Sequence, residues 1–272
     1  MEKILKKYWQ PILLGALLLV SYFPTFIWMW HRWFTKDTYY SHGWLVPFVT
    51  LYLIWQKKDE LSQAVKKESK WGFPLIIIGL GLHLVSTILR IYFTSGFSML
   101  IVLVGIILYC FGREVMRIVV FPVAFLAFMI PLPMVMIANI SFKMKMFAAE
   151  IAAVLLNNMG LQAIRHGSII KMRNAMVVVD DVCSGLRSLI SLTALGSIFA
   201  YWMKGPMVKR IVLFLSTVPI AVVTNVCRVI VLSCISEIWG AEKATGFVHD
   251  ATGYMVFVLA FILLYAVSKI LE

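Results

Sequence analysis

Long apolar runs alternate with short polar connections along the whole chain. A helix needs roughly 20 apolar residues to cross the ~30 Å hydrocarbon core of a bilayer, and runs near this length recur throughout the sequence. On this measure we expect membrane-spanning helices at about 10–30, 42–57, 72–92, 96–112, 117–138, 183–203, 209–235 and 250–269. The pattern therefore predicts an all-α polytopic membrane protein with about eight transmembrane helices, and we treat residues 1–272 as a single integral membrane domain.

The first apolar run resembles a signal peptide because three lysines precede it. The run over residues 11–30 is, however, longer than the ~7–15 residues of a signal-peptide core. It also ends in aromatic and basic residues without a small-residue cleavage site. We therefore interpret it as an uncleaved first span.

One sizeable connection, residues 139–182, lies between the predicted fifth and sixth spans. Its first part, residues 141–164, has apolar residues at helical spacing and polar residues elsewhere, which predicts an amphipathic helix in the membrane interface. The apolar positions are Met144, Ala148, Ile151 and Leu155. Its second part is rich in β-branched residues on both sides of the pair Arg173-Asn174, which predicts a short β-hairpin before the sixth span.

Composition and charge agree with the apolar pattern and fix an expected orientation. The chain is 61% hydrophobic and only 14% charged, whereas soluble domains carry about a quarter charged residues. Its net charge of +12 comes from Lys and Arg clustered in alternate connections, which is typical of orientation signals and not of a nucleic-acid-binding surface. The excess of Lys and Arg places both termini in the cytoplasm and makes the hairpin connection extracytoplasmic. We expect the lipid bilayer, and no nucleic acid, as a partner.

This orientation brings three chemically capable residues to one level of the membrane. Cys183 opens the sixth span, and His249 comes directly before the eighth. Arg228 lies roughly 30 Å along the seventh span from its cytoplasmic start near Lys209, at a rise of about 1.5 Å per residue. We therefore expect an extracytoplasmic active site that contains Cys183, Arg228 and His249.

The stretch around Cys183 contains an unusual number of polar residues for a membrane boundary. Asp180 and Asp181 precede the cysteine, and Arg187 follows it four residues later, on the same face of a helix that starts at Cys183. A helix N-terminus and a nearby cation both favour a thiolate. Cys183 is thus a candidate nucleophile, and the alternative is a small residue packed beside Ser184 and Gly185.

Arg228 and His249 are candidate partners of this nucleophile. Thr224 and Asn225 precede Arg228 by four and three residues, so all three form a polar stripe that is expected to face the bundle interior. A guanidinium there must pair with a carboxylate, a carbonyl or a developing oxyanion, unless it is an anchor that reaches the interface. An imidazole at position 249 suits proton transfer, although it could also be merely solvated.

Other His and Cys residues leave alternatives open. His42 and His166 are expected on the same side of the membrane and compete with His249 for the role of base. The four cysteines show neither a CxxC spacing nor a dense disulfide framework. Cys227 and Cys234 could join Cys183 and His249 as metal ligands, but no ligand spacing supports such a site, and we expect no metal and no cofactor.

Four sequence motifs, in order, resemble the exosortase/archaeosortase family of polytopic membrane transpeptidases. They are residues 40–47 (YSHGWLVP), 183–189 (CSGLRSL), 225–229 (NVCRV) and 249–253 (HDATG). The resemblance implies a Cys–Arg–His active site formed by Cys183, Arg228 and His249. It also implies substrates that are exported proteins with a C-terminal sorting tail, consisting of a Pro-Glu-Pro-type motif, a transmembrane helix and a basic cluster.

The hypothesis that follows is a membrane cysteine endopeptidase or transpeptidase in which Cys183 attacks a substrate carbonyl, Arg228 holds the oxyanion and His249 protonates the leaving amine. The supporting residues expected around this site are Asn225, Arg187, Asp180, Asp181 and His42. A transporter and a non-catalytic assembly subunit are the alternatives. A transporter is disfavoured because the chain shows no evident internal repeat and its polar residues cluster at one face.

Overall fold

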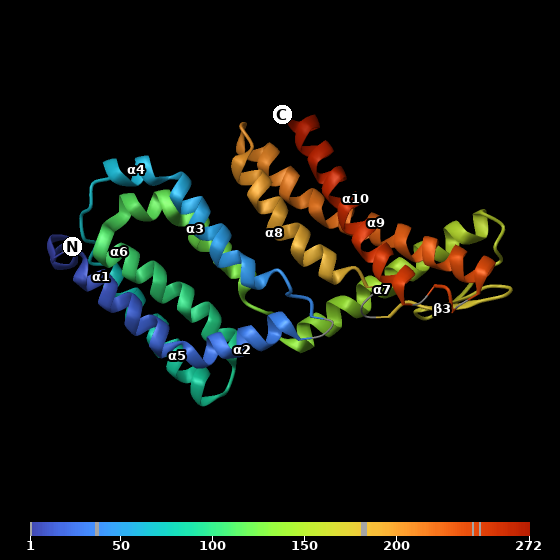
Figure 1. The fold of residues 1–272 in the computed structure, drawn as a ribbon, viewed down its shortest axis with the longest axis horizontal. Coiled ribbons are helices and arrows are strands. Elements are labelled where there is room, and N and C mark those ends of the chain that lie inside the picture. Colours follow the sequence, from blue (N-terminus) through green and yellow to red (C-terminus); the bar gives the residue numbers. More distant parts are fainter. Residues whose placement is uncertain (1, 36–37, 181–183, 241, 245) are drawn as a thin grey trace. The chain divides into compact units, whose positions relative to one another are not determined.

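The computed structural model describes residues 2–35, 38–180, 184–240, 242–244 and 246–272, with the backbone alone described for residues 2–8 and 250. By its internal contacts the chain forms two compact units, Met1–Leu132 and Pro133–Glu272. The described chain is mostly helical, as expected from the sequence, and carries one small sheet (Figure 1). The single-domain interpretation of the whole chain stays a prediction.

The first unit consists of helices joined by short connections. Its elements are α1 (Glu2–Ser21), α2 (Phe23–Phe34), η1 (Gly43–Leu45), α3 (Val46–Gln56), α4 (Lys58–Gln63), α5 (Gly72–Ile88), α6 (Tyr92–Phe125) and η2 (Leu126–Met129). The helical segments Trp9–Ser21 and Phe23–Phe34 are bent by 62° relative to each other. Pro24 lies in the first turn of α2, and a proline at this place cannot supply the N–H that would continue the preceding helix.

Glycines allow α5 and α6 to pack closely in this unit. A Cβ on Gly72 would lie 2.6 Å from the carbonyl oxygen of Gly105, and one on Gly79 would lie 2.6 Å from the side chain of Val102. Small residues at such contacts let helix backbones approach each other, which is how helices associate where the surrounding lipid is as apolar as their side chains. The close approach fixes α5 and α6 as an antiparallel pair.

Residues 117–138, predicted to form one span, do not form one helix. Helix α6 continues from the predicted fourth span through residue 125 with a break at Gly112, whose φ of 84° is outside the helical range. Helix η2 and an extended segment with Pro131 and Pro133 then follow before the next helix begins. Proline removes a helical donor and restrains the residue before it, and these two prolines end the helical run that hydropathy alone extends to residue 138.

The expected number of eight spans is not confirmed. Within the described residues, three helical segments are long and apolar enough to cross a membrane, and a bent pair, Trp9–Ser21 with Phe23–Phe34, is a fourth candidate. The three segments are Tyr92–Met129, Met207–Trp239 and Phe247–Leu271, and shorter apolar helices cover Gly43–Gln56, Gly72–Ile88 and Leu186–Trp202. Length and apolar composition thus support a polytopic membrane protein with fewer full-length helices than the sequence predicted.

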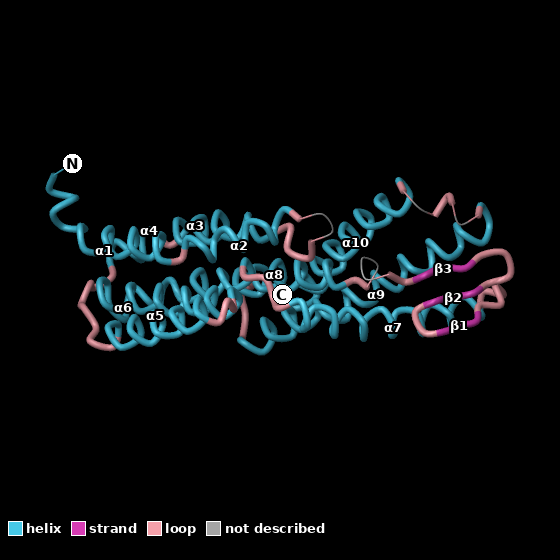
Figure 2. The backbone as a smooth tube through the Cα atoms, turned by 90° about the horizontal axis from the view of Figure 1, so that it is seen from below, coloured by secondary structure: helices cyan, strands magenta, loops and turns pink. Residues whose placement is uncertain are grey.

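The second unit combines helices with the sheet. Its elements are α7 (Met134–Asn158), β1 (Ile164–His166), β2 (Ile169–Lys171), β3 (Met176–Val178), α8 (Leu186–Trp202), α9 (Met207–Trp239) and α10 (Phe247–Leu271). The strands lie side by side in the order β1-β2-β3, all antiparallel, so β1 and β3 are the two edges (Figure 2). The predicted hairpin is confirmed as β2–β3, with Arg173-Asn174 as its turn. Strand β1 was missed, because its first residue, Ile164, was assigned to the preceding helix and Arg165 and His166 were assigned to no element.

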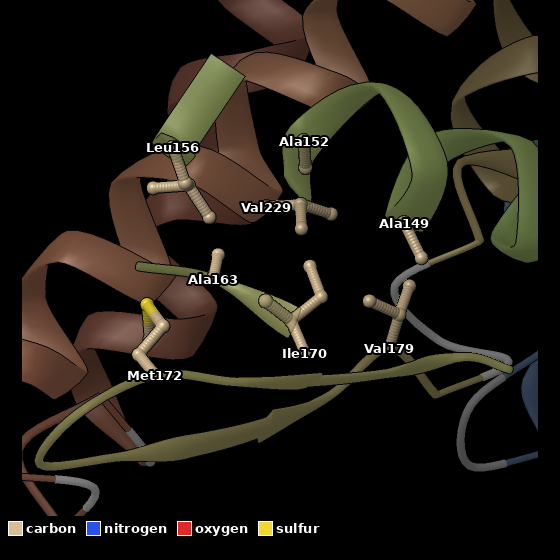
Figure 3. Close-up of a cluster of buried hydrophobic side chains, with 8 residues drawn as sticks. All are labelled: Ala149, Ala152, Leu156, Ala163, Ile170, Met172, Val179 and Val229. Atoms are coloured by element: carbon tan, nitrogen blue, oxygen red, sulfur yellow. The ribbon is translucent and has the colours of Figure 1, made fainter. Parts of the chain in front are cut away.

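The sheet packs on α7 and α9 through a buried apolar cluster (Figure 3). Ala149, Ala152 and Leu156 of α7 and Val229 of α9 cover one face of the strands. The buried face of α7 differs in part from the predicted one: Ala148 is buried as expected, but Leu155 is 40% exposed whereas Leu156 is fully buried. Because alanine is only weakly hydrophobic, a hydropathy pattern does not identify this face as the buried one. The small size of alanine nevertheless lets α7 and the sheet approach closely.

Two contacts hold the hairpin along α9. At the turn, the backbone N–H of Asn174 donates to the carboxylate of Glu237, near the end of α9, at 3.0–3.1 Å. At the other end of β3, Val179 is buried in the same cluster as Val229. The hairpin is thus fixed along roughly two turns of α9.

Candidate functional site

Helix α9 carries the polar stripe into the interior of the second unit. Thr224, Asn225 and Arg228 are 0%, 2% and 8% exposed. Their spacing of three and four residues places them on one helix face, as predicted from the sequence. Cys227, next to Arg228, is exposed, which shows how sharply the polar face of the helix is defined.

The Arg228 guanidinium contacts His249 twice. Its Nη2 donates to the His249 carbonyl oxygen at 3.0 Å and lies 3.3 Å from Nε2 of the imidazole. A guanidinium carries donors only, so a hydrogen bond in this contact would use the lone pair of Nε2 as acceptor and requires the tautomer with its proton on Nδ1. A neutral His249 is the form that can accept a proton from a thiol.

The first turn of α10 is built around the His249 carbonyl. The Thr252 hydroxyl donates to this oxygen at 2.8 Å, beside the guanidinium. A Cβ added to Gly253 would lie 3.4 Å from Nη2 of Arg228, in van der Waals contact with the guanidinium. The residues that follow His249 therefore fix its carbonyl and leave room for the guanidinium.

One hydrogen-bond donor of Arg228 has no partner among the described residues. This donor is the buried Nε of the guanidinium. A buried unpaired donor of a charged group is costly. Such a donor is suited to bind a carboxylate or an oxyanion that arrives with a ligand.

The start of α8 packs directly against the polar stripe. Gly185 precedes the helix with a φ of 78°, and a Cβ there would lie 2.7 Å from Cγ of Asn225. Ser184 is buried, and its Oγ accepts a hydrogen bond from the backbone N–H of Leu186 at 3.3 Å. Gly185 thus combines a left-handed backbone conformation with a close approach to α9, and both features favour glycine.

Cys183 and Asp181 lie outside the described residues. Helix α8 begins at Leu186, and not at Cys183 as predicted. The four-residue helical spacing between Cys183 and Arg187 therefore does not apply, because the left-handed Gly185 interrupts the helix between them. Arg187 is half-buried in the first turn of α8.

A cleft of about 260 Å³ lies beside the Arg228–His249 pair. Residues 176–180 of the hairpin form one side of it, and Val229, Leu232 and Ser236 of α9 form the other, with His249 also in its lining. Asp180, predicted as a supporting residue, is therefore close to the site, although it is exposed to solvent.

Two predicted competitors of His249 differ from it in their surroundings. His166 lies exposed on β1, at the sheet edge opposite β3. His42 belongs to the first unit, where its ring stacks on Tyr40 with centroids 5.9 Å apart. Of the two described histidines of the second unit, His249 contacts Arg228, whereas His166 lies exposed at the sheet edge.

A metal site is not evident in the described part of the chain. No group of three or more His, Cys, Asp or Glu side chains comes together among these residues. Cys227 is exposed and Cys234 is half-buried against the sheet cluster. The alternative in which these cysteines and His249 bind a metal gains no support.

Sequence reasoning missed Ser236 and the role of Thr252. Ser236 is 1% exposed and follows Arg228 by eight residues, with Leu232 halfway between them. This i, i+4, i+8 spacing extends the face of Arg228 along α9 and could have identified Ser236. The role of Thr252 becomes evident only in the structure, where its hydroxyl donates to the His249 carbonyl oxygen.

The fold and this site define a polytopic membrane protein with a buried arginine–histidine pair and a cysteine-containing segment between its sheet and α8. A model of the family described as transmembrane exosortase (Exosortase_EpsH) matches residues 29–266. The chain therefore belongs to the transmembrane exosortase family. No curated protein and no solved structure matches it.

Proposed function

We propose that this protein is a membrane cysteine endopeptidase and transpeptidase that cleaves the C-terminal sorting tails of exported proteins at the outer face of the cell membrane. The substrate would carry a Pro-Glu-Pro-type motif, a transmembrane helix and a basic cluster. The observation that carries the proposal is the contact between the buried Arg228 and His249, with the guanidinium Nε still unpaired among the described residues. Membership of the exosortase family supports the same conclusion.

In the proposed reaction, His249 accepts the proton of the Cys183 thiol, and the thiolate attacks the substrate carbonyl. Arg228 binds the oxyanion of the tetrahedral intermediate. As the C–N bond breaks, His249 returns the proton to the leaving amine and a thioester remains on Cys183. An amine, a hydroxyl or water then attacks the thioester and releases the product and the thiol.

Asn225 and Asp180 would support this chemistry. Asn225 is buried between Arg228 and the segment that follows Cys183 in sequence, because Gly185 packs on its side chain. It could therefore hold the cysteine segment against α9. Asp180 shares a cleft with His249 and could orient the imidazole once substrate draws Arg228 toward the oxyanion.

Replacement of the nucleophile is the direct test. Cys183→Ala should abolish processing of a sorting-tail substrate, while the protein still inserts into the membrane and expresses normally. Cys183→Ser should leave little activity, because an alkoxide is much harder to form than a thiolate. Cys227→Ala, which changes an exposed thiol on α9, is the matched control and should process normally. Normal processing by Cys183→Ala would refute the enzyme and favour the transporter or assembly alternatives.

The proposed sidedness has a separate test. A membrane-impermeant thiol reagent applied to intact spheroplasts should label Cys183 and should not label Cys110, which the charge distribution places near the cytoplasmic face. Permeabilised cells provide the control in which both thiols are accessible to the reagent from either side. Labelling of Cys110 alone from outside would reverse the orientation.

A further inference from the structure

The outer edge of β3 has hydrogen-bonding groups that pair with no strand among the described residues. Residues 168 and 179 are a hydrogen-bonded pair, as are residues 172 and 175, and the register places residues 170 and 177 between them. In an antiparallel ladder, residues alternate between bonding to the partner strand and pointing away from it. The N–H and C=O groups of Met176 and Val178 therefore point away from β2, toward the free edge of the sheet.

This free edge forms one side of the cleft beside His249. All five residues from 176 to 180 line the cleft, opposite Val229, Leu232 and Ser236 of α9. The hydrogen bond between Asn174 and Glu237 and the packing of Val179 near Val229 hold β3 along the helix. No described strand pairs with this edge. An unpaired edge is a ready template for another extended chain.

On the α9 side of the cleft, the Ser236 hydroxyl has no hydrogen-bond partner among the described residues. Ser236 is 1% exposed. An unpaired buried hydroxyl costs free energy, and it is satisfied if a backbone group enters the cleft. This observation is independent of the strand edge and also points to an occupant with polar backbone groups.

We propose that the substrate peptide binds as a fourth strand on the free edge of β3, in the cleft that leads to His249 and Arg228. The N–H and C=O groups of Met176 and Val178 pair with alternate residues of the peptide, and Ser236 binds a peptide group from the α9 side. Side chains of the peptide that face α9 pack on Val229 and Leu232. Main-chain pairing gives affinity in this mode of recognition, and the pockets for alternate side chains give specificity.

This inference rests on the proposed function, because it names how the peptide reaches the same site. It also explains why the hairpin precedes the cysteine motif in the chain. In sequence, Cys183 follows the last residue of β3, Val178, by five positions. Pairing with β3 would therefore set the register of the peptide relative to the nucleophile.

Val178→Pro tests the pairing from the side of the enzyme. The N–H of Val178 points away from β2, so proline removes a bond to the peptide and leaves the ladder within the hairpin intact. Val178→Ala is the matched control, because it shortens the side chain and keeps the N–H. We expect processing of a sorting-tail substrate to fall at least ~10-fold in Val178→Pro relative to Val178→Ala. Equal rates in the two variants would overturn the proposal.

The serine comparison uses two buried hydroxyls on one helix. Ser233 and Ser236 both have unpaired Oγ atoms among the described residues, but only Ser236 lines the cleft. Ser236→Ala should raise KM about 2- to 10-fold, whereas Ser233→Ala should leave KM unchanged. A KM effect of equal size in both variants would mean that the hydroxyls act on the fold and not on the peptide.

A backbone scan of the substrate uses the unaltered enzyme and does not depend on the folding of any variant. Synthetic peptides that span the cleaved segment would carry an N-methyl group at one successive position each. Inhibition of cleavage should alternate with a period of two, because every second N–H faces β3. An effect without this period would overturn strand pairing.

Two further measurements separate this inference from the proposed function. Alkylation of Cys183 by iodoacetamide, followed by mass spectrometry, should proceed at the normal rate in Val178→Pro, which shows that the nucleophile is retained. If Cys183→Ala abolishes processing but Val178→Pro and the N-methyl peptides behave normally, strand pairing fails and the enzyme stands. If Cys183→Ala still processes substrate, the proposed function fails, and the strand-pairing inference fails with it.

Discussion

Both units bury polar side chains among apolar helices, but they bury different kinds of groups. In the first unit three buried contacts join neutral groups in matched pairs, although Oγ1 of Thr50 is buried without a partner among the described residues. Tyr22 bonds to Ser98 at 3.0 Å, Thr25 bonds to Ser95 at 2.6 Å, and the indole N–H of Trp33 donates to the Met129 carbonyl at 2.9 Å. These bonds link α2 and the residue before it to α6, and α2 to η2, and they fix how the helices pack.

In the second unit the buried polar groups include a charge and unpaired donors. Arg228 contacts His249 but keeps its Nε unpaired among the described residues, and the same is true of the Ser236 hydroxyl. Leaving such groups unpaired costs stability, which is expected where a ligand completes the hydrogen bonding. Among the described residues, buried unpaired groups also occur outside the cleft lining, at Thr50, Arg210 and Ser233. The site is distinguished instead because Arg228, with its unpaired Nε, contacts His249, and His249 and the unpaired Ser236 line one cleft.

The comparison predicts the largest effect at Arg228. An anchor needs only charge and length, whereas an oxyanion or carboxylate site needs the planar fork of the guanidinium. Arg228→Lys should lower the processing rate by about 10²–10³-fold, similar to the loss of one oxyanion donor, at near-normal expression. Asn225→Ala should be milder and Lys243→Ala neutral. If Arg228→Lys processed a sorting-tail substrate at the normal rate, Arg228 would not be the group that binds the oxyanion.

Gly185 should show an intermediate effect that is mainly one of stability. Alanine there adopts a left-handed conformation, which costs about 1 kcal/mol, and its Cβ meets Asn225, where overpacking costs a further ~1–3 kcal/mol. Gly185→Ala should therefore lower the unfolding temperature in detergent and reduce processing. Gly81→Ala is the control in the first unit, because a Cβ there has nothing within 4 Å. Equal behaviour of the two variants would contradict the packing of α8 on α9.

The smallest effect is expected for a matched pair of the first unit. Tyr22→Phe and Ser98→Ala should each cost about 0.5–1.5 kcal/mol of stability, and the double variant should cost less than their sum, because both single changes remove the same bond. The processing rate of all three variants should stay within about twofold of normal. Denaturant unfolding and a processing assay measure the two quantities. A large loss of processing rate without a loss of stability would indicate that the first unit contributes to catalysis.

Local sequence patterns predicted several elements of the second unit correctly. The hairpin around Arg173-Asn174 and the inward-facing stripe of Thr224, Asn225 and Arg228 are both present. Each depends on residues close in sequence, whose β-branched runs or helical spacing indicate the local conformation. The same patterns failed where proline and glycine break long apolar runs, at Gly112 and at Pro131 and Pro133, because hydropathy does not register a break in backbone geometry.

The sequence by itself determined the class of protein, its family resemblance and the residues that were expected to react. Tertiary structure decided which histidine of the second unit meets Arg228, since His166 and His249 are equivalent by hydropathy and charge and only their fold environment distinguishes them. It also decided which groups remain unpaired. The free edge of β3 and the unpaired hydroxyl of Ser236 depend on which elements lie beside them. Hydrogen-bond satisfaction is a property of neighbours distant in sequence, and for this reason the fold alone reveals it.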